Sequence, residues 1–295
     1  MAFLLGEHVR VPGLVELIVQ YARSVVYVWR SNGACDTFDP ETGGWAVGSV
    51  VLKNWCGTVA SAAGQLYFYA SGVMYRPRPD GTFTRDVSPW EALLRLLPDT
   101  RVATFKNHMY LVGGHLPLDG AIRYCPTTAR WEQCPGLLDS RFHHELVPLG
   151  HRLYAIGGAT HFPACRTLSS VETFDGRRWT AVASLRRARS LAACAACRGR
   201  LYVCGGSTAE VHTADATVEV YDPRRNTWSF VAPLPVPVRS ATAFAVSGML
   251  YVCGGVGPGY LGSRAVQRYD PTRDRWERLP TDCPWSMQHH TCAVV

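Results

Sequence analysis

The stretch LYVCGG at residues 201–206 is repeated without change at residues 250–255. Two close variants precede it, LYAIGG at 153–158 and MYLVGG at 109–114. The first glycines of the four copies are 44, 48 and 49 residues apart. Self-similarity at such a period is typical of repeat architectures built from small supersecondary units. The sequence is therefore interpreted as a series of similar units.

An aromatic residue and a tryptophan follow each glycine pair. They occur in RYCPTTARW (Tyr124, Trp131), TFDGRRW (Phe174, Trp179), VYDPRRNTW (Tyr221, Trp228) and RYDPTRDRW (Tyr269, Trp276). Two weaker copies, LYFYAS at 66–71 and VYVWRS at 26–31, lack the glycines but are followed by similar aromatic segments. The glycine positions therefore fall near residues 30, 70, 113, 157, 205 and 254, which predicts six units.

Each unit contains four short segments with strand character, separated by turn residues. The pattern predicts an all-β fold, a six-bladed β-propeller of four-stranded antiparallel blades. Tyrosine and tryptophan side chains can each bury roughly 150–250 Å², which is enough to seal one blade against the next. The first unit, from residue 25, lacks its first strand, and MQHHTCAVV at 287–295 aligns with the first strands of later units. We expect residues 288–295 to complete that blade and remove its open edge.

The glycine pair with a spaced aromatic residue and tryptophan resembles the kelch repeat, and the resemblance covers residues 25–295. Residues 1–24 have helical apolar spacing, and HVRVPGL at 8–14 is similar to the end of the BACK region in BTB–BACK–kelch (kelch-like) proteins. A plain N-terminal helical segment is the alternative. The resemblance implies a kelch-like protein lacking the BTB domain, as a truncated relative from a large DNA virus would be, or a fragment of a longer protein.

The amino-acid composition limits the classes of protein to which this chain can belong. Hydrophobic residues make up 47% and charged residues 18%, and no run approaches the ~18 apolar residues of a membrane span. Of the 30 basic residues only Lys53 and Lys106 are lysines, and the arginines are dispersed along the chain, which argues against a nucleic-acid-binding stripe. No signal peptide is recognisable, and 11 cysteines is an odd number, so we expect a reduced, cytoplasmic location without membrane contact.

Patterns that could indicate metal or catalytic chemistry are weak. Cys194 and Cys197 form a single CxxC in an apolar segment, where strand geometry would direct the two thiols to opposite faces. The paired histidines at 143–144 and 289–290 occupy the same place in their units, and repeat packing explains them better than a metal site. No nucleophile-elbow, P-loop or zinc-protease motif occurs, so we expect no enzyme activity, no metal and no cofactor.

The loops that precede each first strand and follow each glycine pair should emerge on one face. Kelch-like adaptors bind peptide segments with this face, so the resemblance implies partner-binding candidates there. These are Ser31, Asn32, Asn54, Arg101, His115, Arg141, Arg189, Ser207, Arg239, Tyr260 and Gln288. The arginine guanidinium can donate two parallel hydrogen bonds to a carboxylate or a phosphate. The expected protein partner therefore carries an acidic or phosphorylated segment. Alternatively, arginine at these positions only closes the turn.

The leading functional hypothesis is a protein-interaction module that recognises a partner through this face, related to cullin ubiquitin-ligase substrate adaptors. Without a BTB domain such a chain would sequester its target instead of recruiting a cullin. An actin-associated kelch protein is the alternative. A metal-dependent kelch-type enzyme is a remote one, because the short loops carry no matching ligand set.

Overall fold

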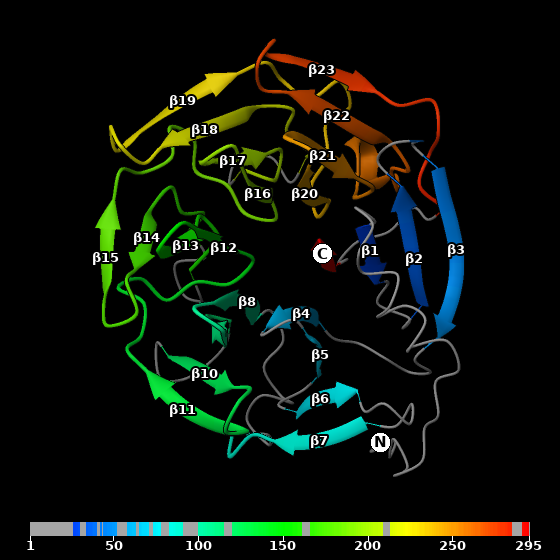
Figure 1. Ribbon diagram of the computed structural model, residues 1–295. Coiled ribbons are helices and arrows are strands. Elements are labelled where there is room, and N and C mark those ends of the chain that lie inside the picture. The colour runs from blue at the N-terminus through cyan, green and yellow to red at the C-terminus, as the bar shows by residue number, and fades with distance from the viewer. Residues whose placement is uncertain are drawn as a thin grey trace.

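The computed structural model describes residues 26–29, 34–39, 42, 44–51, 58–62, 65–70, 73–77, 83–90, 100–114, 120–160, 166–208, 213–284 and 291–294. These residues form six four-stranded sheets, which Figure 1 shows arranged around a central axis. The helical segment expected at residues 1–24 lies outside the described residues. No helix among the described residues is long and apolar enough to cross a membrane.

The strands follow the chain in sets of four. The first sheet combines β1 (Val26–Trp29), β2 (Ala34–Asp39) and β3 (Gly44–Val51) with the last strand, β24 (Thr291–Val294). The second contains β4 (Thr58–Ala62), β5 (Gln65–Ala70), β6 (Val73–Pro77) and β7 (Phe83–Val87). The third contains β8 (Arg101–Phe105), β9 (His108–Val112), β10 (Ala121–Cys125) and β11 (Arg130–Cys134).

The remaining sheets repeat this arrangement. The fourth contains β12 (Glu145–Leu149), β13 (Arg152–Ile156), β14 (Val171–Phe174) and β15 (Trp179–Val182). The fifth contains β16 (Ala193–Cys197), β17 (Arg200–Cys204), β18 (Val218–Asp222) and β19 (Thr227–Val231). The sixth contains β20 (Thr242–Val246), β21 (Met249–Cys253), β22 (Val266–Asp270) and β23 (Arg275–Arg278), with a short 3-10 helix η2 (Pro258–Tyr260) between β21 and β22.

The C-terminal strand pairs with the N-terminal one. β24 runs antiparallel to β1, with Val26 opposite Val294 and Trp29 opposite Thr291. The innermost strands contact one another in cyclic order, from β24 to β4, β8, β12, β16, β20 and back to β24. The two ends of the described chain therefore lie in one sheet, and Figure 1 shows the C-terminus beside β1.

Adjacent sheets pack through one repeated pair of aromatic rings. A tyrosine on the second strand of one sheet meets the aromatic residue on the third strand of the next. The pairs are Tyr67–Tyr124, Tyr110–Phe174, Tyr154–Tyr221, Tyr202–Tyr269 and Tyr251–Phe38, with ring centroids 5.5–6.2 Å apart. The last pair joins the sixth sheet to the first. The expectation that these aromatic residues seal the blades is confirmed.

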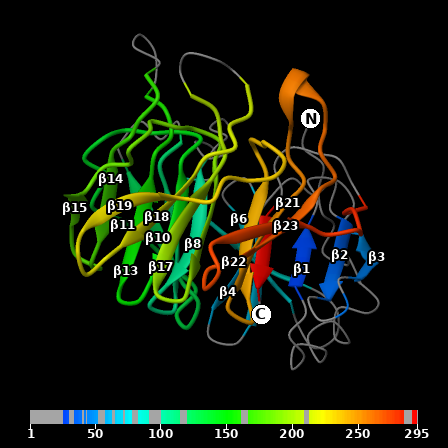
Figure 2. The same ribbon diagram turned by 90° about the horizontal axis from the view of Figure 1, so that it is seen from above.

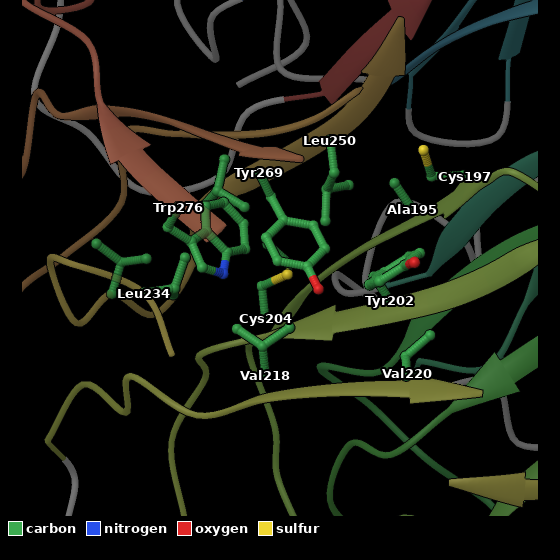
Figure 3. Packing of buried hydrophobic residues seen from close by; sticks show 13 residues of the cluster. Ala195, Cys197, Tyr202, Cys204, Val218, Val220, Leu234, Leu250, Tyr269 and Trp276 are labelled. Carbon is green, nitrogen blue, oxygen red and sulfur yellow. The ribbon is translucent and has the colours of Figure 1, made fainter. Parts of the chain in front are cut away.

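Figure 3 shows the packing between the fifth and sixth sheets. Tyr202 and Val218 from the fifth sheet pack against Tyr269 and Trp276 from the sixth, with Cys204 between them. Trp276 also donates its indole N–H to the carbonyl of Ala232, at 2.8 Å. Trp179 and Trp228 make the same bond to the preceding sheet, so the tryptophans of the fourth, fifth and sixth sheets fix each of these sheets to its predecessor.

Candidate functional site

Two faces of the molecule differ in their connections. Because the strands of each sheet are antiparallel, the segment entering the first strand and the segment joining the second and third strands emerge at the same edge. We call this edge the loop face. The short turns that join first to second and third to fourth strands emerge at the opposite edge, the turn face. In Figure 2, η2 projects from the upper side of the molecule and belongs to the loop face.

Arg141 and Arg189 occupy the segments that enter the fourth and fifth sheets, and both are fully buried. Arg189 donates through Nη1 to the carbonyls of Gly205 and Thr217, at 2.8 and 3.1 Å. Its Nη2 donates to Thr217 Oγ1 at 3.0 Å and to Glu219 Oε1 at 2.7 Å. Arg189 and Glu219 have no exposed side-chain surface, so they form a buried ion pair.

The fourth sheet contains the same arrangement. Arg141 donates to the carbonyls of Gly157 and Ser170 and to Ser170 Oγ, and its Nη2 lies 2.5 Å from Glu172 Oε1. Glu172 also accepts the backbone N–H groups of Leu138 and Asp139. Burial lowers the pKa of Arg141, and the adjacent carboxylate of Glu172 opposes that shift. In both sheets this arginine–glutamate pair connects the segment that enters the sheet to the third strand of the same sheet.

This geometry does not fit a partner-binding role for Arg141 and Arg189. Their guanidinium groups are enclosed and bonded to groups of their own sheet, so they have no surface with which to fork a carboxylate of another molecule. The structure favours the alternative role, in which arginine fixes the loop before the first strand. The sequence signal was available, because a hydroxyl residue and a glutamate recur as Ser170–Glu172 and Thr217–Glu219.

The backbone register also corrects the alignment of Arg239 with these two arginines. The second glycine of each pair donates its N–H across to the next incoming segment, from Gly158 to Arg189 and from Gly206 to Val238. Val238, which is buried, is therefore the counterpart of Arg189. The sixth sheet has Ala265 and Gln267 in place of Thr217 and Glu219. The sixth sheet thus has uncharged side chains at the positions where the fifth sheet has the buried ion pair.

Arg239 lies one residue further along and is half-buried on the loop face. Its guanidinium carbon lies 5.1 Å from the centre of the Tyr260 ring, in a cation–π contact. Tyr260 is 66% exposed and Leu261 is 73% exposed, both on the projecting loop between β21 and β22. A hydrogen bond from Gly257 N–H to the Leu261 carbonyl, at 2.7 Å, closes this loop. The structure therefore brings two of the candidates, Arg239 and Tyr260, together beside an exposed leucine that sequence reasoning missed.

The other described candidates have structural contacts. Arg101 donates from Nε to the His144 carbonyl at 2.8 Å, and its Nη2 lies 3.3 Å from Glu145 Oε1 in the next sheet. Ser207 is buried, in a two-way backbone bridge with Ser190. Five further candidates lie outside the described residues and stay predictions: Ser31, Asn32, Asn54, His115 and Gln288.

Two of the sequence patterns considered for metal binding, the CxxC at 194–197 and the histidine pair at 143–144, have packing roles; His289 and His290 lie outside the described residues. Cys194 packs between the fourth and fifth sheets, and Cys197 packs between the fifth and sixth, so the two thiols diverge as expected. His144 is fully buried between the glycine turns of two sheets, and burial lowers its pKa well below the usual value. Within the described ranges, no group of three or more His, Cys, Asp or Glu residues could hold a metal ion.

Comparison with known proteins adds a family relationship. Residues 100–295 match the sequence model of the KLHDC2/KLHL20/DRC7 Kelch-repeats domain. The chain is 33% identical to mouse Kelch-like protein 35 over 192 residues, which cover 64% of this chain and 31% of that protein. It is 29% identical to human Kelch-like protein 34 over 218 residues, covering 64% of this chain and 32% of that protein. The chain thus spans about a third of the length of these relatives.

Proposed function

Because the chain belongs to the kelch-repeat family, we propose that it is a protein-binding module that recognises a partner through its loop face. The observation that carries this proposal is the exposed Tyr260 ring stacked on Arg239, with Leu261 beside it. Exposed aromatic and arginine side chains are the residue types most often responsible for affinity at protein interfaces. This geometry supports the binding of a protein partner.

We further propose that the partner presents an acidic or phosphorylated segment. Arg239 makes no hydrogen bond or ion pair from its guanidinium to the described residues, in contrast to Arg141 and Arg189. Its planar fork is free to take a carboxylate or phosphate from one side while Tyr260 covers the other. The exposed Leu261 adds an apolar contact, so an acidic residue next to an apolar one is the expected pattern in the partner.

The cellular role proposed for this recognition is substrate selection of the kind performed by ubiquitin-ligase adaptors, in the cytoplasm. We also propose that the six sheets form a closed six-bladed propeller, with β24 as the innermost strand of the first blade. The cyclic contacts of the inner strands and the ring contact between Tyr251 and Phe38 support closure. A closed ring would give the loop face a fixed shape.

The test is peptide binding, measured on an array that varies acidic, phosphoserine and apolar positions. We expect the selected peptides to bind the wild type and to lose at least tenfold in affinity to Arg239→Ala and to Tyr260→Ala. Arg273→Ala is the control, because Arg273 is exposed on the opposite face. Equal affinities for the wild type and both loop-face variants would contradict the proposed site. Selection of peptides without acidic or phosphorylated residues would contradict the proposed partner class.

A further inference from the structure

The turn face concentrates the positive charge of the molecule. The described turn segments of the third to sixth sheets carry eleven cationic side chains, all exposed: Lys106, Arg130, Arg152, Arg177, Arg178, Arg198, Arg200, Arg224, Arg225, Arg273 and Arg275. The same segments carry four carboxylates, those of Asp175, Asp222, Asp270 and Asp274. Their net charge is +7, equal to the formal charge of the whole chain. The other 19 basic residues are therefore balanced by the other 19 acidic ones.

The turns of neighbouring sheets are joined into one surface. Lys106 Nζ, in the turn between β8 and β9, donates to the Asp175 carbonyl in the turn between β14 and β15, at 2.7 Å. Arg198 Nε, in the turn between β16 and β17, donates to the Gly248 carbonyl of the next sheet at 2.8 Å. These bonds join the cationic turns of the third sheet to the fourth and those of the fifth sheet to the sixth. Arginines that are far apart in the sequence share this face because every sheet has the same antiparallel order.

The carboxylates on this surface are already occupied. Asp175 Oδ1 accepts the backbone N–H groups of Arg177 and Arg178, and Asp222 Oδ1 accepts those of Arg224 and Arg225. These backbone bonds hold the pKa values of both aspartates below the usual range. Each aspartate closes its turn, and the arginine side chains that follow extend into solvent. Rigid turns that present pairs of arginines suit a repeating array of anions.

From this surface we propose that the turn face binds double-stranded nucleic acid through its phosphate backbone, without sequence preference. Arginine matches phosphate geometry with two parallel hydrogen bonds, and ten of the eleven cations are arginines. None of the exposed large hydrophobic residues of the described chain, which are Val87, Leu138, Phe230, Tyr260 and Leu261, belongs to these turns. A protein partner would need an apolar centre, and a single strand would need aromatic rings for base stacking.

Backbone binding to a duplex needs only charge, and this agrees with what the face offers. The proposal reverses the expectation drawn from the sequence, in which the arginines are dispersed. It is independent of the loop face, which lies at the opposite edge of the sheets and takes a different kind of ligand. Both ligands could be bound at the same time.

The experiment is a fluorescence titration of labelled 20-base-pair DNA and RNA duplexes at several salt concentrations. We expect micromolar affinity at about 0.1 M salt, and a linear fall of log K with log salt concentration. The double variant Arg224→Gln/Arg225→Gln should lower the salt slope by up to about 1.8 and weaken binding several-fold. Arg186→Gln/Arg187→Gln is the matched control, because it removes the same charge from the loop face beside the same sheet.

Several outcomes would overturn the proposal. The first is absence of binding to either duplex at 50 mM salt. The second is equal weakening by the two double variants, which would indicate attraction to net charge instead of to the turn face. Binding of poly-L-glutamate or of phosphatidylserine vesicles, lost in Arg224→Gln/Arg225→Gln while duplex is not bound, would assign the surface to an acidic protein or to a membrane. Thermal melting of both variants checks that they fold.

Discussion

The substitution Glu219→Gln tests whether the buried ion pair with Arg189 belongs to the folding of the fifth sheet. Glu219 is fully buried, accepts the backbone N–H groups of Arg186 and Arg187, and bonds Arg189 Nη2 at 2.7 Å. Glutamine would leave the buried guanidinium of Arg189 facing an amide donor, with Asp215 Oδ2, 4.0 Å from Nη1, as its remaining counter-charge. Removing one partner of a buried pair costs about 3–5 kcal/mol. A loss of that size should lower the melting temperature by at least about 6 °C.

The sixth sheet shows which changes would offset this loss. At the equivalent positions it has Pro235 for Arg186, Val238 for Arg189, Ala265 for Thr217 and Gln267 for Glu219. Gln267 accepts the N–H of Val236 at 2.8 Å and donates to its carbonyl at 3.1 Å, so the neutral unit satisfies its polar groups. The quadruple variant Arg186→Pro/Arg189→Val/Thr217→Ala/Glu219→Gln should therefore recover most of the stability, to within about 1 kcal/mol of the wild type.

The assay is urea unfolding followed by tryptophan fluorescence and circular dichroism, with a double-mutant cycle to extract the coupling. Glu277→Gln is the control, because Glu277 pairs with Arg268 at the surface, where both side chains are more than a third exposed. Surface pairs contribute about 0–1 kcal/mol, so this variant should unfold at nearly the wild-type midpoint. The reasoning is refuted if Glu219→Gln behaves like Glu277→Gln, or if the quadruple variant is less stable than Glu219→Gln.

Three further outcomes are expected. Gly158→Ala should lower the free energy of unfolding in urea by about 2–4 kcal/mol, because the φ of Gly158 is +96° and a Cβ would lie 2.6 Å from the Phe142 carbonyl oxygen. Gly150 has open space around it, so Gly150→Ala should lower the free energy of unfolding by about 1 kcal/mol. Deleting residues 291–295 should lower the melting temperature by several degrees, because β1 loses its partner β24, whereas an unchanged value would argue against ring closure. Hydrogen bonds from Thr127 and Thr128 lower the pKa of Cys125 to about 6, so iodoacetamide should alkylate Cys125 first, with a rate that levels off above about pH 7. Burial raises the pKa of Cys194, so this thiol should be protected. Mass spectrometry of the labelled sites measures both outcomes.

The fold was largely accessible from the sequence because its determinants repeat. Glycine pairs, aromatic residues and tryptophans recur at one period, and in the fourth to sixth sheets each tryptophan has the same kind of backbone partner. A contact that repeats can be predicted without knowing which distant residues meet, because each repeat packs against a neighbour of similar sequence. The pairing of residues 288–295 with the first unit followed from the same counting, and Thr291–Val294 do form β24.

The candidate site was less accessible, because burial depends on what stands opposite a side chain in the folded sheet. Arg189 and Arg239 have similar neighbours in the sequence, each followed by a serine, but the segment from Arg239 to β20 is one residue shorter. That single residue places Val238, and not Arg239, opposite Gln267. The partner that encloses Arg189, Glu219, lies 30 residues further along the chain, so the sequence around the arginine does not reveal it.

The charge on the turn face has a related cause. Along the sequence the arginines are separated by strands, and no cluster is visible. Antiparallel pairing brings every second connection to the same edge, so arginines in alternate turns gather while those between them go to the other face. The charge of one face of such a protein is therefore best predicted by adding the charges of every second connection between strands. By that count the turns from Lys106 to Arg275 form one cationic surface, and the loops between them hold the buried pairs and Arg239, which stacks on Tyr260.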